Sequence, residues 1–210
     1  MLRGALTLSV FVLALCLALP VYAAHHEDKK DDSMKKGDGM AAMEGTLVCV
    51  QVTEGGDVET MSEFTECSGT VVMVGSDKAA AVAAKKDDMK GMKGGKQSVN
   101  GVVAGHTRGW ILGTQSALDE SGAKEASVSG TIVCLLPNYE DGSVAPVVAT
   151  APCGEKDQHL HVVTTSGGQV YALHGSEDAI SKLEASTDRN EVQLQGKIQG
   201  DQGAWVLFVN

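Results

Sequence analysis

The sequence predicts an all-β protein made of two tandem small β-barrels, with one short helix in each copy. The first observation is a repeated strand, because residues 45–49 (GTLVC) return as residues 130–134 (GTIVC). The second is a repeated ending, in which Gly101 and Gly196 are each followed nine residues later by a tryptophan. The third is a series of short β-branched segments bounded by glycine, which is typical of strands joined by turns.

In the second copy, each element follows from a local pattern. The repeated strand continues to residue 136, and two more strands at 159–165 and 169–173 are joined by a Ser-Gly-Gly turn typical of a hairpin. Residues 177–184 predict a short helix, because Ile180 and Leu183 share a face and acidic residues occupy the first turn. Alternation at 192–198 and an apolar run at 204–209 predict the last two strands.

The first copy has the same order with weaker signals. Strands are expected at 46–52 and 70–75, and a closing pair of strands leads to Trp110. The alanine-rich segment 79–84 occupies the place of the second copy's helix, and its composition favours a helix by propensity.

This order of five strands, with a helix before the last two, resembles the oligonucleotide/oligosaccharide-binding (OB) fold. The second copy is similar to the small OB-like domains of exported bacterial proteins in its GTIVC opening, its hairpin strand GGQVYAL (167–173) and its closing strand VQLQGKI (192–198). The resemblance covers residues 128–210 and, more loosely, 44–115. It implies a fold and carries over no functional residue.

The first 23 residues have the features of an export signal. Arg3 precedes an apolar run at 6–19, and Val21-Tyr22-Ala23 offers small residues around a cleavage site. The run has 14 residues, fewer than the roughly 20 that a membrane-spanning helix needs, so a cleaved signal is favoured over the alternative of an uncleaved membrane anchor. After cleavage we expect no stable membrane insertion. The sequence therefore predicts a periplasmic or secreted protein.

The remaining chain is expected to divide into four parts. Residues 24–43 predict a disordered acidic arm that contains methionine, and residues 116–127 predict a polar linker. The linker separates a first OB-like domain at 44–115, with a flexible charged loop at 85–97, from a second at 128–210.

Four cysteines remain after signal removal, and an even number in an exported protein favours disulfides. The repeat selects the pairs Cys49–Cys67 and Cys134–Cys153, because these close equivalent loops inside each copy. Each bond is expected to add about 3 kcal/mol to stability. A zinc or redox site made of four thiolates is the competing interpretation, and it has less support because no two of these cysteines are closer than 18 residues.

Charge and aromatic content limit the partners. Without Arg3 the chain has 16 basic and 27 acidic residues, a net charge of −11, which opposes nucleic-acid binding. Too few aromatic residues remain to form a stacking platform, and Trp110 and Trp205 are expected to pack in the cores. A metal cation or a basic protein is the more natural partner, and no feature predicts the oligomeric state.

One predicted transition-metal site lies at the start of the mature chain. Cleavage after Ala23 would leave Ala24-His25-His26, whose amine, two backbone amides and His26 imidazole can surround copper or nickel in a square plane. The arm adds soft ligands for Cu(I) in Met34, Met40 and Met43, and the charged loop of the first copy adds Met89 and Met92. The alternative is an ordinary acidic tether.

A second predicted metal site lies in the second copy. His159 and His161 are two residues apart on one strand and share a face, and His174 follows the next strand. Together with Glu155 or Asp157 they could hold zinc or copper. The alternative is a solvated strand face that carries histidines.

These features favour an exported, non-enzymatic binding module for copper, nickel or a basic protein. Two alternatives are a structural or interaction protein of the cell envelope, without a small-molecule site, and a hydrolase. The sequence contains no Gly-x-Ser-x-Gly, His-Glu-x-x-His, phosphate-loop or Cys-x-x-Cys motif, so catalysis has the least support.

Overall fold

The computed structural model describes residues 40–107, 109–114, 123–148, 152–154 and 157–210. The expected signal, the arm as far as residue 39 with His25 and His26, and residues 116–122 of the expected linker lie outside the described residues. Within the described ranges, neither helix combines the length and the apolar content needed to cross a membrane.

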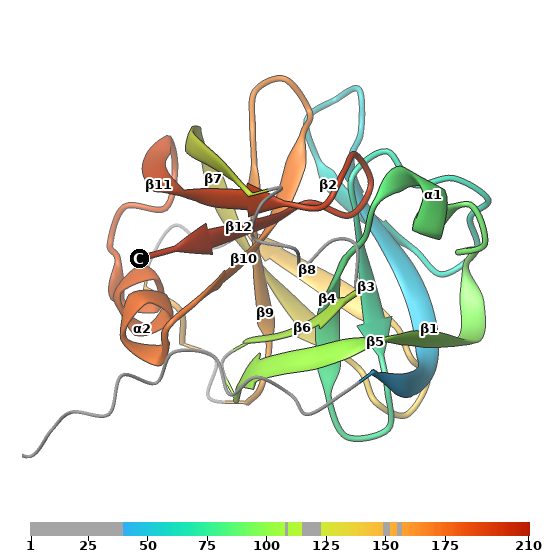
Figure 1. The fold of residues 1–210 in the computed structure, drawn as a ribbon. Helices are drawn as coiled ribbons and strands as arrows, with labels where there is room; N and C mark the ends of the chain where they lie inside the picture. The colour runs from blue at the N-terminus through green and yellow to red at the C-terminus, as the bar shows by residue number, and fades with distance from the viewer. Residues whose placement is uncertain (1–39, 108, 115–122, 149–151, 155–156) are drawn as a thin grey trace, which may run out of the picture. The chain divides into compact units, whose positions relative to one another are not determined.

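The first copy forms a closed five-stranded barrel (Figure 1). Going round the barrel the order is β1-β3-β4-β6-β5, and β5 pairs back with β1 to close the ring. The β4–β6 pair is parallel and its neighbours are antiparallel. A short strand, β2, lies outside the ring and pairs with the end of β1. Helix α1 lies between β4 and β5 in the chain. The bounds are β1 (Ala41–Val52), β2 (Val58–Met61), β3 (Thr70–Val74), β4 (Ala79–Ala83), α1 (Lys86–Met89), β5 (Gly95–His106) and β6 (Gly109–Gly113).

The second copy, yellow to red in Figure 1, repeats this topology strand for strand. Its ring is β7-β9-β10-β12-β11, and the pairing of β11 with β7 closes it. Strand β8 lies outside the ring and pairs with the end of β7, and the β10–β12 pair is parallel. The bounds are β7 (Lys124–Pro137), β8 (Val144–Val148), β9 (Leu160–Thr164), β10 (Val170–Gly175), α2 (Glu177–Ala185), β11 (Val192–Gln199) and β12 (Val206–Val209). The predicted all-β fold of two small closed barrels is confirmed, and it is consistent with tandem OB-like domains.

The two predicted helices have different outcomes. Helix α2 forms where expected, and the Ser176 side chain caps it by accepting a hydrogen bond from the Ala179 backbone N–H at 3.2 Å. The helix expected at 79–84 is wrong, because residues 79–83 form strand β4. All five residues of β4 are buried, so tertiary packing on both faces of the strand overrides the helical propensity of alanine.

The barrels close through strand ends that the sequence pattern did not predict. Residues 41–43 were expected in the arm, and residues 124–127 in the linker, but they belong to β1 and β7. These ends make the closing pairings with β5 and β11. The expected flexible loop at 85–97 contains α1, the buried Met92 and the start of β5.

The two copies share a hydrophobic core. Along β3 and β4, successive residues alternate between the first barrel's own core and a second cluster that includes residues of both copies. In the second copy, Val162 belongs to the shared cluster and Val163 to the barrel's own core. The shared cluster comprises Val48, Val50, Val72, Val74, Ala79, Ala81, Ala83, Ala104, Ile111, Val133, Leu135, Val144, Leu160, Val162, Val170, Ala172 and Val206. This explains why these strands are buried on both faces.

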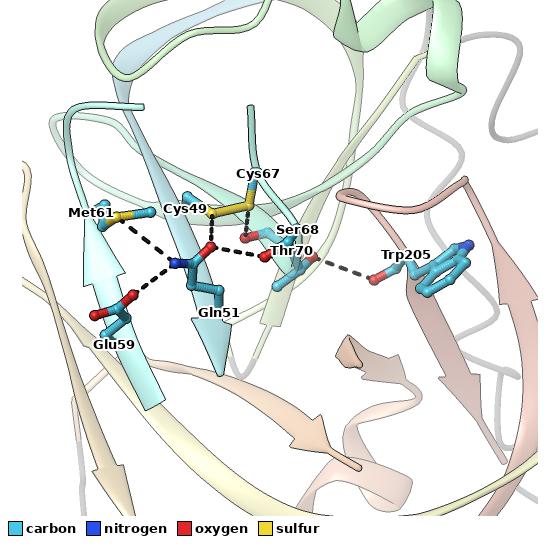
Figure 2. The surroundings of a disulfide bond; sticks show 8 residues. All are labelled: Cys49, Gln51, Glu59, Met61, Cys67, Ser68, Thr70 and Trp205. Atoms are coloured by element: carbon cyan, nitrogen blue, oxygen red, sulfur yellow. Dashed lines mark hydrogen bonds between the residues drawn. A yellow bond between two sulfur atoms is a disulfide. The ribbon is translucent and has the colours of Figure 1, made fainter. Parts of the chain in front are cut away.

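Several of the contacts between the copies come in matched pairs. Strand β3 contacts β10 as β9 contacts β4, and β2 contacts its counterpart β8. The Thr60 hydroxyl donates to the Val144 carbonyl at 2.8 Å. The Thr70 hydroxyl donates to the Trp205 carbonyl at 3.5 Å (Figure 2). Such pairing indicates that an approximate two-fold axis relates the two barrels.

The two tryptophans are only partly buried. Trp110 packs against the first barrel's core, with the Lys78 ammonium 5.1 Å from its ring centroid. Trp205 stacks on Tyr171, with ring centroids 5.1 Å apart. Both side chains therefore lie at the margins of the barrels, whereas the sequence led us to expect them inside the cores.

Candidate metal centre

Strand register brings three potential ligands together. Cys134 in β7 lies directly opposite His161 in β9. Because alternate residues of a strand share a face, His159, just before β9, projects to the same side as His161. Both histidines and Cys134 are buried.

The fourth ligand comes from the loop before β9, and helix α2 holds it in place. The backbone N–H of Cys153 donates a hydrogen bond to the Glu184 carbonyl, in the last turn of α2, at 2.8 Å. The capped helix therefore fixes the position of a half-buried cysteine that has no regular secondary structure of its own.

The four side chains converge on one point. The sulfur atoms of Cys134 and Cys153 are 3.4 Å apart, and Cys153 Sγ is 3.2 Å from His159 Nε2. The two Nε2 atoms of His159 and His161 are 3.1 Å apart, and all four ligand atoms lie within 4.8 Å of one another. Around a tetrahedral zinc ion such atoms would be about 3.3–3.8 Å apart, given Zn–S bonds of about 2.3 Å and Zn–N bonds of about 2.0–2.1 Å. The three separations above are shorter than these values by a few tenths of an ångström, and any pair near the 4.8 Å limit would have to approach by about 1 Å to bind one ion.

A backbone carbonyl orients His159 for this role. Its Nδ1 lies 2.7 Å from the Asp157 carbonyl, which can only accept, so Nδ1 carries the hydrogen and Nε2 faces the centre. Histidines that bind metals commonly donate their other ring N–H to a carbonyl or carboxylate in this way. Asp157 therefore contributes its backbone oxygen, not the carboxylate we expected as a ligand, and Glu155 lies outside the described residues.

Two charged side chains surround the centre. Arg189 is fully buried, and its Nη2 donates a hydrogen bond to Cys134 Sγ at 3.3 Å. The Glu184 carboxylate, also buried, lies 3.9 Å from His159 Nε2 and 4.0 Å from His161 Nε2. A divalent ion with two thiolates would be neutral, and the charges of Arg189 and Glu184 would cancel, so the buried centre would carry no net charge.

Burial also sets the proton state of the inner cysteine. It raises the pKa of the Cys134 thiol to about 12; the hydrogen bond with Cys153 adds to this rise, and the Arg189 charge opposes it. At neutral pH, without a metal, Cys134 is therefore a thiol. A metal ion that binds here must displace that proton, as is usual for thiolate ligands.

The predicted Cys134–Cys153 disulfide is not formed, since both residues are free thiols. The predicted Cys49–Cys67 disulfide is formed (Figure 2). Beside it, the Gln51 amide bridges two neighbours, donating to the Glu59 carboxylate at 2.7 Å and accepting from a serine hydroxyl at 2.9 Å (Figure 2).

The two cysteine pairs have different neighbours in the two copies. In the first copy Val71 is opposite Cys49, where the second copy has His161 opposite Cys134. Two residues earlier the first copy has Gly69, where the second has His159. The sulfur atoms of the first copy therefore meet no imidazole at these positions, whereas those of the second copy face two.

His174 does not join this centre. It follows Leu173, which pairs with His161, so the side chain of His174 points to the opposite face of the sheet. There it stacks on His106 at 5.9 Å and meets the edge of Phe208 at 5.4 Å. Burial lowers the pKa of His174 to about 4, with a smaller contribution from the charge of His106.

Sequence reasoning therefore found the two histidines and both cysteines but did not combine them. It looked for cysteine ligands at short spacing, whereas these ligands come from separate segments that the barrel brings together. Arg189 and Glu184 were not predicted, because only the fold places them here. The usable signal was the repeat itself, in which His161 takes the place of an apolar residue.

No protein-family model, curated protein or solved structure matches this chain.

Proposed function

We propose that this chain is a metal-binding module that holds one zinc ion between Cys134, Cys153, His159 and His161. The observation that carries the proposal is the convergence of these four ligand atoms within 4.8 Å, in a site where three of the four side chains are buried. A buried group of two thiols and two imidazoles, with one imidazole already oriented by a carbonyl, has the composition of a structural zinc site.

The ligand set favours zinc over the copper or nickel that the sequence suggested. Two sulfur and two imidazole ligands in a tetrahedral arrangement suit Zn²⁺, whereas Cu(II) and Ni(II) prefer square-planar nitrogen and oxygen ligands. The copper or nickel site predicted from His25 and His26 is a separate hypothesis about the N-terminal arm.

The same set supports a role in binding rather than catalysis. Catalytic zinc sites keep a coordination position open for water or substrate, and four protein ligands would fill a tetrahedral shell. An envelope protein without a metal and a hydrolase are therefore the less favoured alternatives. The Cys49–Cys67 disulfide is consistent with an oxidising compartment, and it supports the proposal that the protein is periplasmic or secreted.

Titration calorimetry with Zn²⁺ tests the proposal on protein that shows two free thiols. We expect one zinc ion per chain. The variant His161→Val carries the residue that the first copy has at this position, and it should bind zinc at least about 100-fold more weakly while its circular dichroism stays that of the parent. His174→Gln, a change at a buried histidine outside the centre, should bind as the parent does. Absence of zinc binding by the parent, or parent-like binding by His161→Val, would reject the metal centre.

A further inference from the structure

We infer that Cys153 is a site of thiol–disulfide exchange, at which a small dialkyl disulfide such as glutathione disulfide oxidises the Cys134–Cys153 pair and expels the bound metal. The expulsion of the metal rests on the function proposed above. The exchange itself does not, because it needs only the two thiols and their positions.

The first argument is distance. The sulfur atoms of Cys134 and Cys153 are already 3.4 Å apart, so a disulfide of ordinary length, about 2.05 Å, requires them to approach by about 1.4 Å. The backbone of Cys153 is anchored to α2 and Cys134 is held in strand β7, so the Cys153 side chain, outside any helix or strand, must supply most of that movement.

The second argument is the first copy, which contains the oxidised form of the same arrangement. Cys49 occupies the position in GTLVC that Cys134 occupies in GTIVC, and it is bonded to a cysteine 18 residues later. Cys153 follows Cys134 by 19 residues. This barrel framework therefore accommodates a disulfide at that place, and in the second copy the same two sulfurs have a metal centre as the alternative.

The third argument is a difference in access, which sets the order of events. Cys134 is 1% exposed, whereas Cys153 is half-buried and can be reached from solvent. Arg189 donates a hydrogen bond to Cys134 Sγ and keeps that sulfur beside its partner. Cys153 is therefore the residue that reacts with an external disulfide, and Cys134 resolves the product.

The chemistry balances with the external disulfide as oxidant. Cys153 Sγ attacks one sulfur of RSSR, forming a mixed disulfide and releasing the first RSH. Cys134 Sγ then attacks Cys153 Sγ, forming the internal bond and releasing the second RSH. Two protein thiols lose two electrons, RSSR gains them, and the two thiol protons leave on the two RSH molecules. When zinc is bound, the products are the internal disulfide, two thiolates RS⁻ and Zn²⁺.

Loss of the metal follows from the ligands that remain. Disulfide sulfurs carry no negative charge and are poor metal ligands, because the thiolate is the form that binds metals. Only the imidazoles of His159 and His161 would be left, and a half-filled shell should not retain the ion.

The test treats the purified protein with glutathione disulfide, with and without bound zinc. Zinc release is followed with a chromogenic chelator, and the bonds formed are identified by peptide mass spectrometry. The parent should form the Cys134–Cys153 bond and release one zinc ion per bond, while the Cys49–Cys67 bond stays intact as an internal control. The parent keeping two free thiols in excess oxidant would overturn the inference.

Two variants test the order of attack. Cys134→Ser should stop at a mixed disulfide on Cys153, with the mass of one added glutathionyl group. Cys153→Ser should be modified at least about 10-fold more slowly, because only the buried thiol remains. Equal rates in the two variants would overturn the assignment of Cys153. If the parent formed the internal bond but bound no zinc, the metal function would be rejected and the exchange site would be supported. If it bound zinc but formed no internal bond, the exchange site would be rejected and the metal function would be supported.

Discussion

His161 lies directly opposite Cys134 in the ladder between β7 and β9, and both side chains are buried. The first copy has a valine and a disulfide-bonded cysteine at the same two positions. A duplicated barrel thus carries one closed disulfide and one pair of thiols beside two imidazoles. This difference between otherwise matching copies provides the ligands of the proposed metal centre.

The buried guanidinium of Arg189 should support the metal centre. Its Nη2 donates to Cys134 Sγ, while Nε and Nη1 have no hydrogen-bond partner among the described residues. We expect Arg189→Met to weaken zinc binding by about 10–100-fold, the usual cost of removing a partner of a metal ligand. The metal-free variant should be less stable than the parent, because the charge of the buried Glu184 carboxylate would no longer be offset by that of a buried guanidinium.

Titration calorimetry measures the zinc affinity, and urea unfolding in the presence of a chelator measures the stability of the metal-free protein. Arg189→Lys is the matched control, since it retains the charge but loses the fork geometry, and its zinc affinity should fall between those of the parent and Arg189→Met. Unchanged zinc affinity in Arg189→Met would contradict a role for this side chain at the centre.

The shared core predicts that the two barrels unfold together. Leu135 belongs to the second copy but packs in the cluster common to both, and it is fully buried. Leu135→Ala should destabilise the protein by about 2–5 kcal/mol. Fluorescence can report on each copy separately, because Trp110→Phe and Trp205→Phe each leave one tryptophan.

Both reporters should show the same midpoint shift in urea when Leu135→Ala is added. Val148→Ala, at a side chain that is 56% exposed, should change stability by less than about 0.5 kcal/mol. If the first copy's tryptophan showed an unchanged transition, the barrels would be independent units and the shared core would have no energetic importance.

His174 predicts a loss of stability in mild acid. Its folded-state pKa is about 4, against about 6.5 in an unfolded chain, so the unfolded state binds more protons between these values. The contribution of neutral His174 is fully present above pH 6.5 and is lost as the pH falls towards 4. Between pH 7.5 and pH 5 the loss should be about 2 kcal/mol.

Urea unfolding of the parent and His174→Leu at both pH values, in chelator, isolates this effect from other titrating groups. The parent should lose about 2 kcal/mol more than the variant between pH 7.5 and pH 5. An equal loss in both proteins would show that His174 does not titrate in this way.

Local patterns predicted much of this fold, since the repeat, the hairpin around the Ser-Gly-Gly turn and the helix at 177–184 all appear in the structure. The alanine segment 79–84 was misjudged because alanine has high helix propensity, and only packing on both faces makes it a strand. The ends of β1 (41–43) and β7 (124–127) were missed because they are short and carry little alternation of apolar and polar residues, although their pairings close the barrels.

The metal centre was less predictable because it depends on long-range register. Cys134 and His161 are far apart in sequence, and only the β7–β9 pairing places them opposite each other. The histidines at 159 and 161, two residues apart, were visible in the sequence, but His174 was grouped with them wrongly, since a shift of one residue along β10 reverses its face. The cysteines were assigned to a bond because the repeat favoured symmetry between the copies, and the copies differ at this point.

X-ray absorption at the zinc edge tests the central claim most directly. For the parent protein loaded with one equivalent of zinc, we predict a four-coordinate shell with two sulfur atoms at about 2.3 Å and two imidazole nitrogens at about 2.0–2.1 Å. A shell of nitrogen and oxygen only, or zinc lost on simple dialysis, would contradict a metal centre formed by Cys134, Cys153, His159 and His161.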